Sequence, residues 1–464
     1  PTGAGRRVAG RRVMRQARWA GLLDRFQNPT QVIATGFGAA ALLGTLLLSL
    51  PIATASGEPT GWITALFTAT SAVSLTGLTI VDTERHWSLF GELVIILLAQ
   101  IGGLGIMTLA TLFTVIVSGR IGLRARMFAA AETKALSAGD VRRVVRKVAL
   151  FSLVAEVTVA AVLTVRLMTG YGEPFLRAVY LGAFHGVSAF NNAGLALWPD
   201  SLARFVTDAW VCLPIAFASI VGGLGFPVVF ELLRSWRHPR RWSLVTRLTL
   251  WVSAVLLALG TFVLTVTEWA NPRTLGALDD PGKILAGFFM AVMPRSAGFA
   301  AIDVAEMNPS SWLAIDALMF IGGGSASTAG GIKVTTLGML VFIIWAEMRG
   351  EPRVNIGNRR LPEPAQRQAV ALVMTLATLI AVSTYLLLVL TPHSLDQVLF
   401  EVVSAAATVG LSTGITPDIP AAGQVLLALL MFVGRTGPLT LGSALALRER
   451  ARLYELPEER VIVG

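Results

Sequence analysis

Four glycine-centred stretches recur along the sequence, and their backbone carbonyl oxygens are candidate ligands for an ion. They read SAVSLTGLTIVD, SAFNNAGLAL, MPRSAGFAAID and SAAATVGLSTGITPD. Aligned on Gly77, Gly194, Gly298 and Gly410, three of the four place a serine six residues earlier, and the third has Val292 there. A cation that loses its water needs oxygen ligands, which a ring of backbone carbonyls supplies without charged side chains. Glycine reaches positive φ at no steric cost, so it lets carbonyls turn toward an axis.

We therefore predict that these stretches form a cation selectivity filter. Short helices leading into the loops would direct the negative ends of their dipoles at the pore, which favours a cation. Asp82 and Asp303, each five residues after its glycine, are expected to concentrate cations at the outer mouth. The candidate filter residues are Leu75, Thr76 and Gly77; Asn192, Ala193 and Gly194; Ser296, Ala297 and Gly298; and Thr408, Val409 and Gly410.

Each stretch lies between two apolar spans that must hold it in place. A second glycine-rich signature recurs in the span after each loop, starting at Gln100, Ile220, Phe320 and Phe432. For the glycines of its first two copies, close packing of helices is the preferred interpretation; these are Gly102, Gly103, Gly105, Gly222, Gly223 and Gly225. The expected outer spans are roughly 30–52, 143–169, 244–268 and 366–391, and the inner ones roughly 88–118, 206–234, 311–347 and 420–447. All are long enough for the ~20 residues that cross a hydrocarbon core.

The segments between the spans are too short to cross a membrane, so they must enter and leave on the same side. Irregular backbone at membrane depth is tolerated only where it is buried in protein or lines water. The predicted fold is an all-α polytopic membrane protein with four parallel span/re-entrant pore loop/span repeats around one central pore, and eight transmembrane spans. The expected divisions are a basic cytoplasmic arm (1–29), pore repeats at 30–118, 119–235, 236–349 and 350–447, and a cytoplasmic tail (448–464).

Composition excludes several classes of protein. The chain is 54% hydrophobic and only 14% charged, against about 25% charged residues in a soluble domain. One cysteine and four scattered histidines exclude a disulfide framework and argue against a metal centre, and no enzyme signature is present. The net charge of +10 does not indicate nucleic acid, because the arginines cluster beside apolar spans. By the positive-inside rule, both termini are expected in the cytoplasm.

A third motif, IGGGSASTAGGIK, interrupts the third inner span. From Ser311 to Glu347 are 37 residues, about 55 Å as one helix, whereas a hydrocarbon core is ~30 Å thick. The helix must therefore break within this run. A phosphate-binding loop needs glycine directly before its lysine, but Ile332 intervenes. Two interpretations of this run remain: a passive kink, and a flexible gate in the permeation path. We call residues 321–333 the gate loop; the candidate gate residues are Gly322, Gly323, Gly324, Ser325, Ser327, Thr328, Gly330, Gly331 and Lys333, with Arg435.

Charges within spans are costly and usually functional. Arg435 is expected to be a barrier to cations below the filter and an anchor for the closed gate loop, with the hydroxyls of Ser325, Ser327 and Thr328 as candidate partners. The alternative is a snorkelling or structurally paired arginine. Lys333 is ambiguous, since it can simply reach the cytoplasmic interface.

The roles of the other charged residues within spans are harder to infer from the sequence. We predict that Arg295 and Glu401, which flank the third and fourth loops, pair to brace the filter. Glu156 and Asp316 are either buried partners or contacts in a dimer, and the sequence does not decide between these roles.

Taken together, the motifs resemble the Trk/Ktr/HKT superfamily of cation transporters, and within it the KtrB-type membrane subunit of bacterial Ktr potassium uptake systems. The resemblance runs from GTLLLSLPIA through TSAVSLTGL, SAFNNAGL, RSAGF, STAGGIKVTT and EVVSAAATVGLSTGIT to FVGRTGPLTL and PEERVIVG. Glycine in all four filters is associated with potassium in this superfamily, and serine in the first with sodium, so Gly77 implies potassium. Pro294 departs from the pattern and is expected to alter the end of the third pore helix.

The resemblance also implies partners. It implies a homodimer in the bacterial plasma membrane, with one pore per protomer, seated on a cytosolic KtrA-type regulatory ring whose bound ATP or ADP controls the gate loop. The terminal VIVG, ending at Gly464, would pack near the dimer interface. K⁺ is the transported ion, Na⁺ is a candidate coupling or activating ion, and no organic cofactor is expected.

The predicted function is a channel-like potassium uptake pore, not an enzyme. A sodium-selective or weakly selective relative would share all these features and stays open as an alternative. A polytopic membrane enzyme is the more remote alternative, because the titratable residues are dispersed. A transporter built on inverted repeats is disfavoured because these repeats run parallel.

Overall fold

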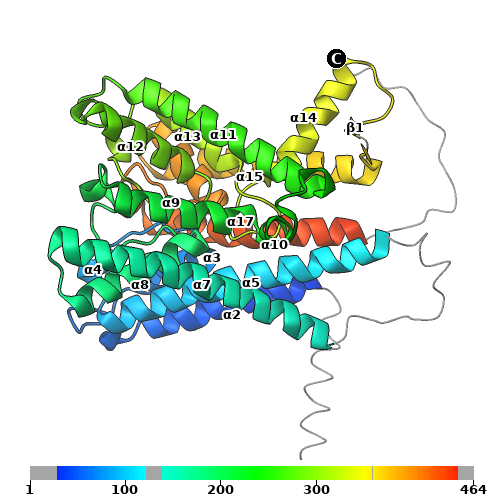
Figure 1. Cartoon of the computed structure of the whole chain (residues 1–464). Helices are drawn as coiled ribbons and strands as arrows, with labels where there is room; N and C mark the ends of the chain where they lie inside the picture. The colour runs from blue at the N-terminus through cyan, green and yellow to red at the C-terminus, as the bar shows by residue number, and fades with distance from the viewer. Residues whose placement is uncertain (1–28, 122–137, 358, 448–464) are drawn as a thin grey trace, which may run out of the picture.

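The computed structural model describes residues 29–121, 138–357 and 359–447, and this part of the chain is almost wholly helical (Figure 1). The expected basic arm, apart from Pro29, and the C-terminal tail lie outside the described residues. The long helices are α2 (Pro29–Leu48), α5 (Leu89–Ile121), α7 (Ala138–Tyr171), α11 (Leu244–Glu268), α15 (Glu363–Leu390) and α17 (Ala421–Leu447). Two further apolar segments are broken in two, as α9 (Ala209–Leu224) with α10 (Phe226–Ser235), and α13 (Pro309–Phe320) with α14 (Val334–Met348).

Four short helices lead into the four glycine loops. They are α3 (Trp62–Ser74), α8 (Phe175–Asn191), α12 (Asp280–Val292) and α16 (Leu395–Ala406). Helix α3 packs against α2 and α5, α8 against α7 and α9, and α16 against α15 and α17, whereas α12 packs against α11 and α9. A one-turn helix, α4 (Thr83–His86), and a small hairpin of β1 (Asn355–Ile356) and β2 (Arg359–Arg360) complete the regular elements, apart from short 3₁₀ turns.

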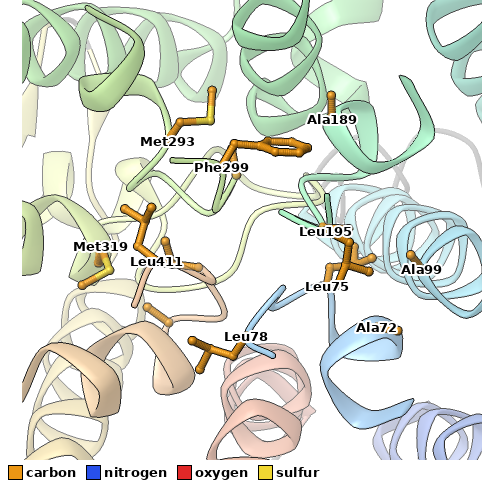
Figure 2. Packing of buried hydrophobic residues seen from close by; sticks show 14 of the residues in the cluster. Ala72, Leu75, Leu78, Ala99, Ala189, Leu195, Met293, Phe299, Met319 and Leu411 are labelled. Atoms are coloured by element: carbon orange, nitrogen blue, oxygen red, sulfur yellow. The ribbon is translucent and has the colours of Figure 1, made fainter. Parts of the chain in front are cut away.

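The polarity of the molecule suits a bilayer. Large apolar side chains lie exposed on the outer helices, for example Trp251 at 71%, Phe262 at 66% and Val389 at 68% exposure. Within the described residues, three helices are long and apolar enough to cross a membrane unaided, at Val144–Tyr171, Leu244–Glu268 and Glu363–Leu390. The bent pair α9 and α10 makes a fourth if it counts as one span. Buried apolar residues instead surround the glycine loops, where Leu75, Leu195, Phe299 and Leu411 pack (Figure 2).

The second inner span, expected at roughly 206–234, is divided into two helices. Helices α9 and α10 meet at an angle of 98°. Gly225 lies between them with φ +91°, a conformation that glycine adopts without strain. Pro227 follows at the start of α10 and cannot supply the N–H that would continue α9. The segment predicted as a span over roughly 206–234 is therefore helical but sharply bent, and the sequence analysis did not foresee the bend.

The third inner span breaks where the sequence predicts it. Helix α13 ends at Phe320 and α14 begins at Val334, so the gate loop lies between them. Its two ends are tied together, because Gly322 N donates to Ile332 O (2.9 Å) and Ile332 N donates to Phe320 O (3.0 Å). Pro294 follows the end of the third short helix: α12 ends at Val292, and Met293 still has helical backbone (φ −65°, ψ −39°). The helix does not continue because Pro294 has no N–H to donate to the carbonyl four residues earlier.

Candidate functional site

The four glycine loops form a closed ring. We call residues 75–77, 192–194, 296–298 and 408–410 filter loops 1 to 4. A methyl group added to any of the four glycines would lie within 3.0 Å of the carbonyl oxygen of the middle residue of the next loop. The fourth loop contacts the first in the same way, which closes the ring. The distances from the added carbon are 2.4 Å for Gly77 to Ala193 O, 3.0 Å for Gly194 to Ala297 O, 2.2 Å for Gly298 to Val409 O and 2.1 Å for Gly410 to Thr76 O. The structure thus brings all four predicted triplets together.

The filter loops share one backbone path. Each glycine has positive φ, as predicted, but the first residue of each loop is left-handed as well: φ is 59° at Leu75, 56° at Asn192, 77° at Ser296 and 51° at Thr408. A residue with a Cβ adopts this conformation at a cost of roughly 1–2 kcal/mol. The sequence analysis included these positions in the filter but did not predict their left-handed backbone, because four different side chains occupy them. The ring is therefore defined by backbone conformation, while its side chains differ.

The aligned serines connect three of the four loops to their short helices by hydrogen bonds. Ser71 Oγ donates to Leu78 O (2.7 Å), and Ser188 Oγ donates to Leu195 O (2.8 Å). In the fourth loop, Gly410 N donates to Ser404 Oγ (3.0 Å). Val292 cannot do this in the third loop. The serine that recurs six residues before three of the glycines thus fixes the exit of its own loop.

A cavity of about 420 Å³ lies above the ring and is lined by all four filter glycines. Asp82 and Asp303, the residues predicted for the outer mouth, line this cavity, and each also caps a short helical turn. The sequence analysis missed Asp200, which lines the same cavity. The spacing in the sequence could have indicated Asp200, because it follows Gly194 by six residues, and Asp82 and Asp303 follow their glycines by five.

The gate loop packs against three of the four filter loops. Gly330 N donates to Ser296 Oγ (2.8 Å), and Ser296 Oγ donates to Thr408 O (2.7 Å). The side chains of Thr328 and Asn192 are hydrogen-bonded at 3.1 Å. A methyl group on Gly330 would lie 2.0 Å from Thr408 Oγ1 of filter loop 4. The candidate gate residues are thus in direct contact with the candidate filter residues.

Arg435 holds the gate loop through a backbone atom. Its side chain, on α17, is only 4% exposed, and Nη1 donates to Thr328 O at 2.5 Å. The predicted partners were hydroxyl groups, which was wrong: Ser325 is bonded to the Thr335 hydroxyl (2.9 Å) and Ser327 to Gly324 O (2.6 Å). Those hydroxyls are engaged in folding the loop, so a carbonyl is left to accept from the guanidinium.

Lys333 lies at the end of the gate loop and turns back into it. Its Nζ donates to Ala329 O at 2.5 Å, and the side chain is only partly exposed. This contact stabilises the turn that contains Gly330. The suggestion that Lys333 simply reaches the cytoplasmic interface is not supported.

Arg295 and Glu401 do not pair in the described structure, so the predicted brace was wrong in its partners. Arg295 Nη2 donates to Ser253 Oγ (2.8 Å). Glu401 is fully buried and accepts hydrogen bonds from Ser412 Oγ (2.6 Å), Thr413 N (2.8 Å) and Thr416 Oγ1 (2.8 Å). The donors follow filter loop 4 directly, so Glu401 fixes the exit of its own loop.

Glu401→Gln is expected to lower stability modestly. Glutamine keeps one acceptor oxygen but replaces the other by an N–H₂ group, so the hydroxyl of Thr416 loses its acceptor. Loss of a hydrogen bond to a buried charged group corresponds to about 1–3 kcal/mol. Thermal unfolding of the purified variant in detergent measures this, with Glu58→Gln on the exposed surface as control. Equal melting temperatures for the two variants would contradict the role of Glu401 in fixing the exit of filter loop 4.

Glu156 is a buried partner behind filter loop 2. It is 5% exposed and accepts from Ser152 Oγ (2.5 Å), Gln100 Nε2 (3.0 Å) and Asn191 Nδ2 (3.1 Å). Asn191 is the last residue of α8, directly before the loop. Asp316 is also buried, and its Oδ1 has no hydrogen-bond partner within the described residues.

Glycines of the second signature bring the inner helices close to the short ones. A methyl group on Gly102 would lie 2.2 Å from Val73 O, one on Gly103 would lie 1.9 Å from Asn191 Oδ1, and one on Gly222 would lie 2.0 Å from Phe190 O. The packing interpretation of these three glycines is confirmed. Gly225 is different, because it forms the bend between α9 and α10.

An apolar helical bundle whose buried centre is a ring of backbone loops, beneath an acidic cavity, has the architecture of a membrane transporter. The chain belongs to the TrkH family of cation transport proteins, whose family model matches residues 12–450. This family consists of transporters and not of enzymes.

Individual relatives agree with the family. The chain is 39% identical to the Ktr system potassium uptake protein B of Bacillus subtilis, over 94% of this chain and 97% of that protein. It is 35% identical to the potassium/sodium uptake protein NtpJ of Enterococcus hirae, over 94% of this chain and 97% of that protein. The crystal structure of the potassium transporter TrkH from Vibrio parahaemolyticus superposes with a TM-score of 0.68 at 16% identity, over 90% of this chain and 85% of that one. That likeness indicates a shared fold.

Proposed function

We propose that this chain is the pore-forming membrane subunit of a bacterial potassium uptake system. The observation that carries the proposal is the closed ring of filter loops, in which each glycine abuts the middle carbonyl of the next loop. Backbone oxygens around such a ring replace the hydration shell of K⁺. Asp82, Asp200 and Asp303 raise the cation concentration in the cavity outside it.

In this proposal the chain crosses the bacterial plasma membrane eight times. The four repeats surround one pore, and both termini are in the cytoplasm. The gate loop closes the pore beneath the filter, and Arg435 adds a positive charge that opposes cations there. Inward movement needs no ATP-hydrolysing site in this chain, because the membrane potential supplies about 2.3 kcal/mol per charge for each 100 mV.

The proposal includes partners. Two copies of the chain form a homodimer, each with its own pore, on a cytosolic ring of nucleotide-binding subunits that controls the gate loop. The names of the B. subtilis and E. hirae relatives support uptake of potassium, and the latter also names sodium. Sodium as a coupling ion or as a second permeant ion is therefore the alternative that deserves a direct test.

The test is rubidium uptake and growth on low potassium, in a bacterial strain without its own potassium importers that expresses this chain with its regulatory subunit. Rescue of growth, with rubidium uptake that excess sodium does not compete away, supports the proposal. Sodium uptake that excess potassium does not reduce would establish the alternative. Absence of both fluxes despite verified membrane expression would overturn the pore assignment.

A further inference from the structure

Helix α10 departs from the direction of the other long apolar helices. It meets α9 at 98°, and in Figure 1 it is seen end-on, while the long helices run across the view. If the long helices cross the bilayer as proposed, α10 lies along the plane of the membrane. Its position after an inner span places it at the cytoplasmic side.

The inner side of α10 is anchored in the protein. The rings of Phe226 and Phe230 lie 4.0 Å apart and contact Phe151 of α7, which also contacts Phe190 of the second short helix. At the other end, Glu231 accepts from Ser243 N and Ser243 Oγ, both at 2.7 Å. Residues 236–242 therefore form a short, closed connection between α10 and α11.

The bend before α10 is bonded directly to the gate loop. Gly324 N donates to Gly223 O (2.7 Å), and Thr328 N donates to Gly222 O (3.3 Å). Phe226 N, at the start of α10, donates to Ala326 O (3.4 Å). A methyl group on Gly225 would lie 2.4 Å from Ser325 O. Any tilt of α10 thus changes contacts that hold the gate loop in place.

The outer side of α10 combines exposed apolar and basic groups. Leu233 is 67% and Trp236 is 64% exposed, and the Arg237 guanidinium lies 4.9 Å from the centre of the Trp236 ring. Arg234, Arg237, Arg240 and Arg241 are all exposed. The one acid of this segment, Glu231, is engaged with Ser243. Tryptophan and leucine beside arginine on a helix that lies in the membrane plane fit the boundary between acyl chains and headgroups.

We propose that α10 and residues 236–241 bind the phosphate groups of anionic phospholipids at the cytoplasmic leaflet, and that this binding stabilises the closed gate loop. The inference rests on the proposed pore function. Arginines that face an anionic surface attract its headgroups, and Trp236 and Leu233 enter the acyl region. Bound lipid holds α10 flat, which preserves the carbonyl positions of Gly222 and Gly223 that bind the loop.

The test uses the purified full chain with phosphatidylglycerol as the probe. The variant is Arg237→Gln/Arg240→Gln/Arg241→Gln, and the matched control is Arg349→Gln/Arg353→Gln/Arg359→Gln, which removes three exposed arginines beside α14 and the hairpin. Native mass spectrometry in detergent counts retained phosphatidylglycerol. Rubidium flux into liposomes is then measured with and without that lipid. Should the triple variant fail to fold, Arg237→Gln alone serves.

Retention is expected to fall about fivefold for each arginine removed from the surface, and much less in the control. Phosphatidylglycerol should lower basal rubidium flux in the parent and the control but not in the variant. Equal retention of phosphatidylglycerol in the variant and the control would overturn the proposed lipid-binding surface. Equal lipid dependence of flux would overturn the link to the gate. If no liposome conducts rubidium, the pore function fails, whereas retention still decides the surface.

Discussion

Gly77→Ser is expected to lower the preference for potassium over sodium by at least tenfold, which corresponds to about 1.4 kcal/mol. Gly77 has φ +84°, and an added Cβ would lie 2.4 Å from Ala193 O. Serine must therefore strain its own backbone, displace the neighbouring carbonyl, or both. A displaced carbonyl no longer matches the ring to a dehydrated potassium ion. Competition between sodium and rubidium during uptake into liposomes measures the change.

The chain offers a matched control for Gly77→Ser. Gly57 has a similar φ of +74°, yet an added Cβ there meets nothing within 4 Å. Gly57→Ser carries the same backbone strain away from the filter, so it should leave selectivity unchanged. If Gly77→Ser keeps the parent's selectivity while both variants reach the membrane, the first filter loop does not act as proposed.

Arg435→Ala is expected to raise rubidium uptake in the absence of the regulatory subunit by roughly ten- to a hundredfold. The variant loses the hydrogen bond to Thr328 O, and a bond from a charged donor contributes about 1.5–3 kcal/mol. That free energy is removed from the closed state of the gate loop. The change also removes the positive charge that opposes a cation below the filter. Both effects act in the same direction, toward conduction.

Arg435→Lys separates these two effects. Lysine keeps the charge but cannot reproduce the guanidinium geometry, so uptake should rise less than with alanine. Gel filtration of each purified variant checks that the buried substitution leaves the protein folded. Uptake and regulation identical to the parent in a folded Arg435→Ala protein would exclude both the barrier and the anchor.

The features that repeat in the sequence were the ones it predicted well. Gly77, Gly194, Gly298 and Gly410 share a requirement for positive φ and close contact, which only glycine meets, so the pattern reveals their positions. The break between α13 and α14 was predictable because 37 residues of apolar helix exceed the thickness of a bilayer. Both arguments rest on backbone geometry and length.

Features that depend on side-chain partners were not predictable in the same way. Arg295 and Glu401 are close to the filter in sequence, yet they do not bind each other. Arg295 binds Ser253, and Glu401 binds the 412–416 segment.

The bend at Gly225 was missed because α9 and α10 together have an ordinary span length. A glycine followed two residues later by Pro227 was the available signal, and it was outweighed by the apolar composition.

The gate loop has a consequence for how a pore of this kind opens. It is a single segment, bonded to filter loops 2 and 3 through Asn192 and Ser296 and packed against Thr408 of filter loop 4. Four identical subunits would place four equivalent gates around the axis and could open them cooperatively. Here one chain contributes all four loops, their first side chains differ, and one gate suffices. In the proposed pore, the single gate loop therefore opens without cooperativity among the four repeats, and a sigmoidal response would have to arise between the two protomers of the proposed dimer or in the proposed regulatory subunits.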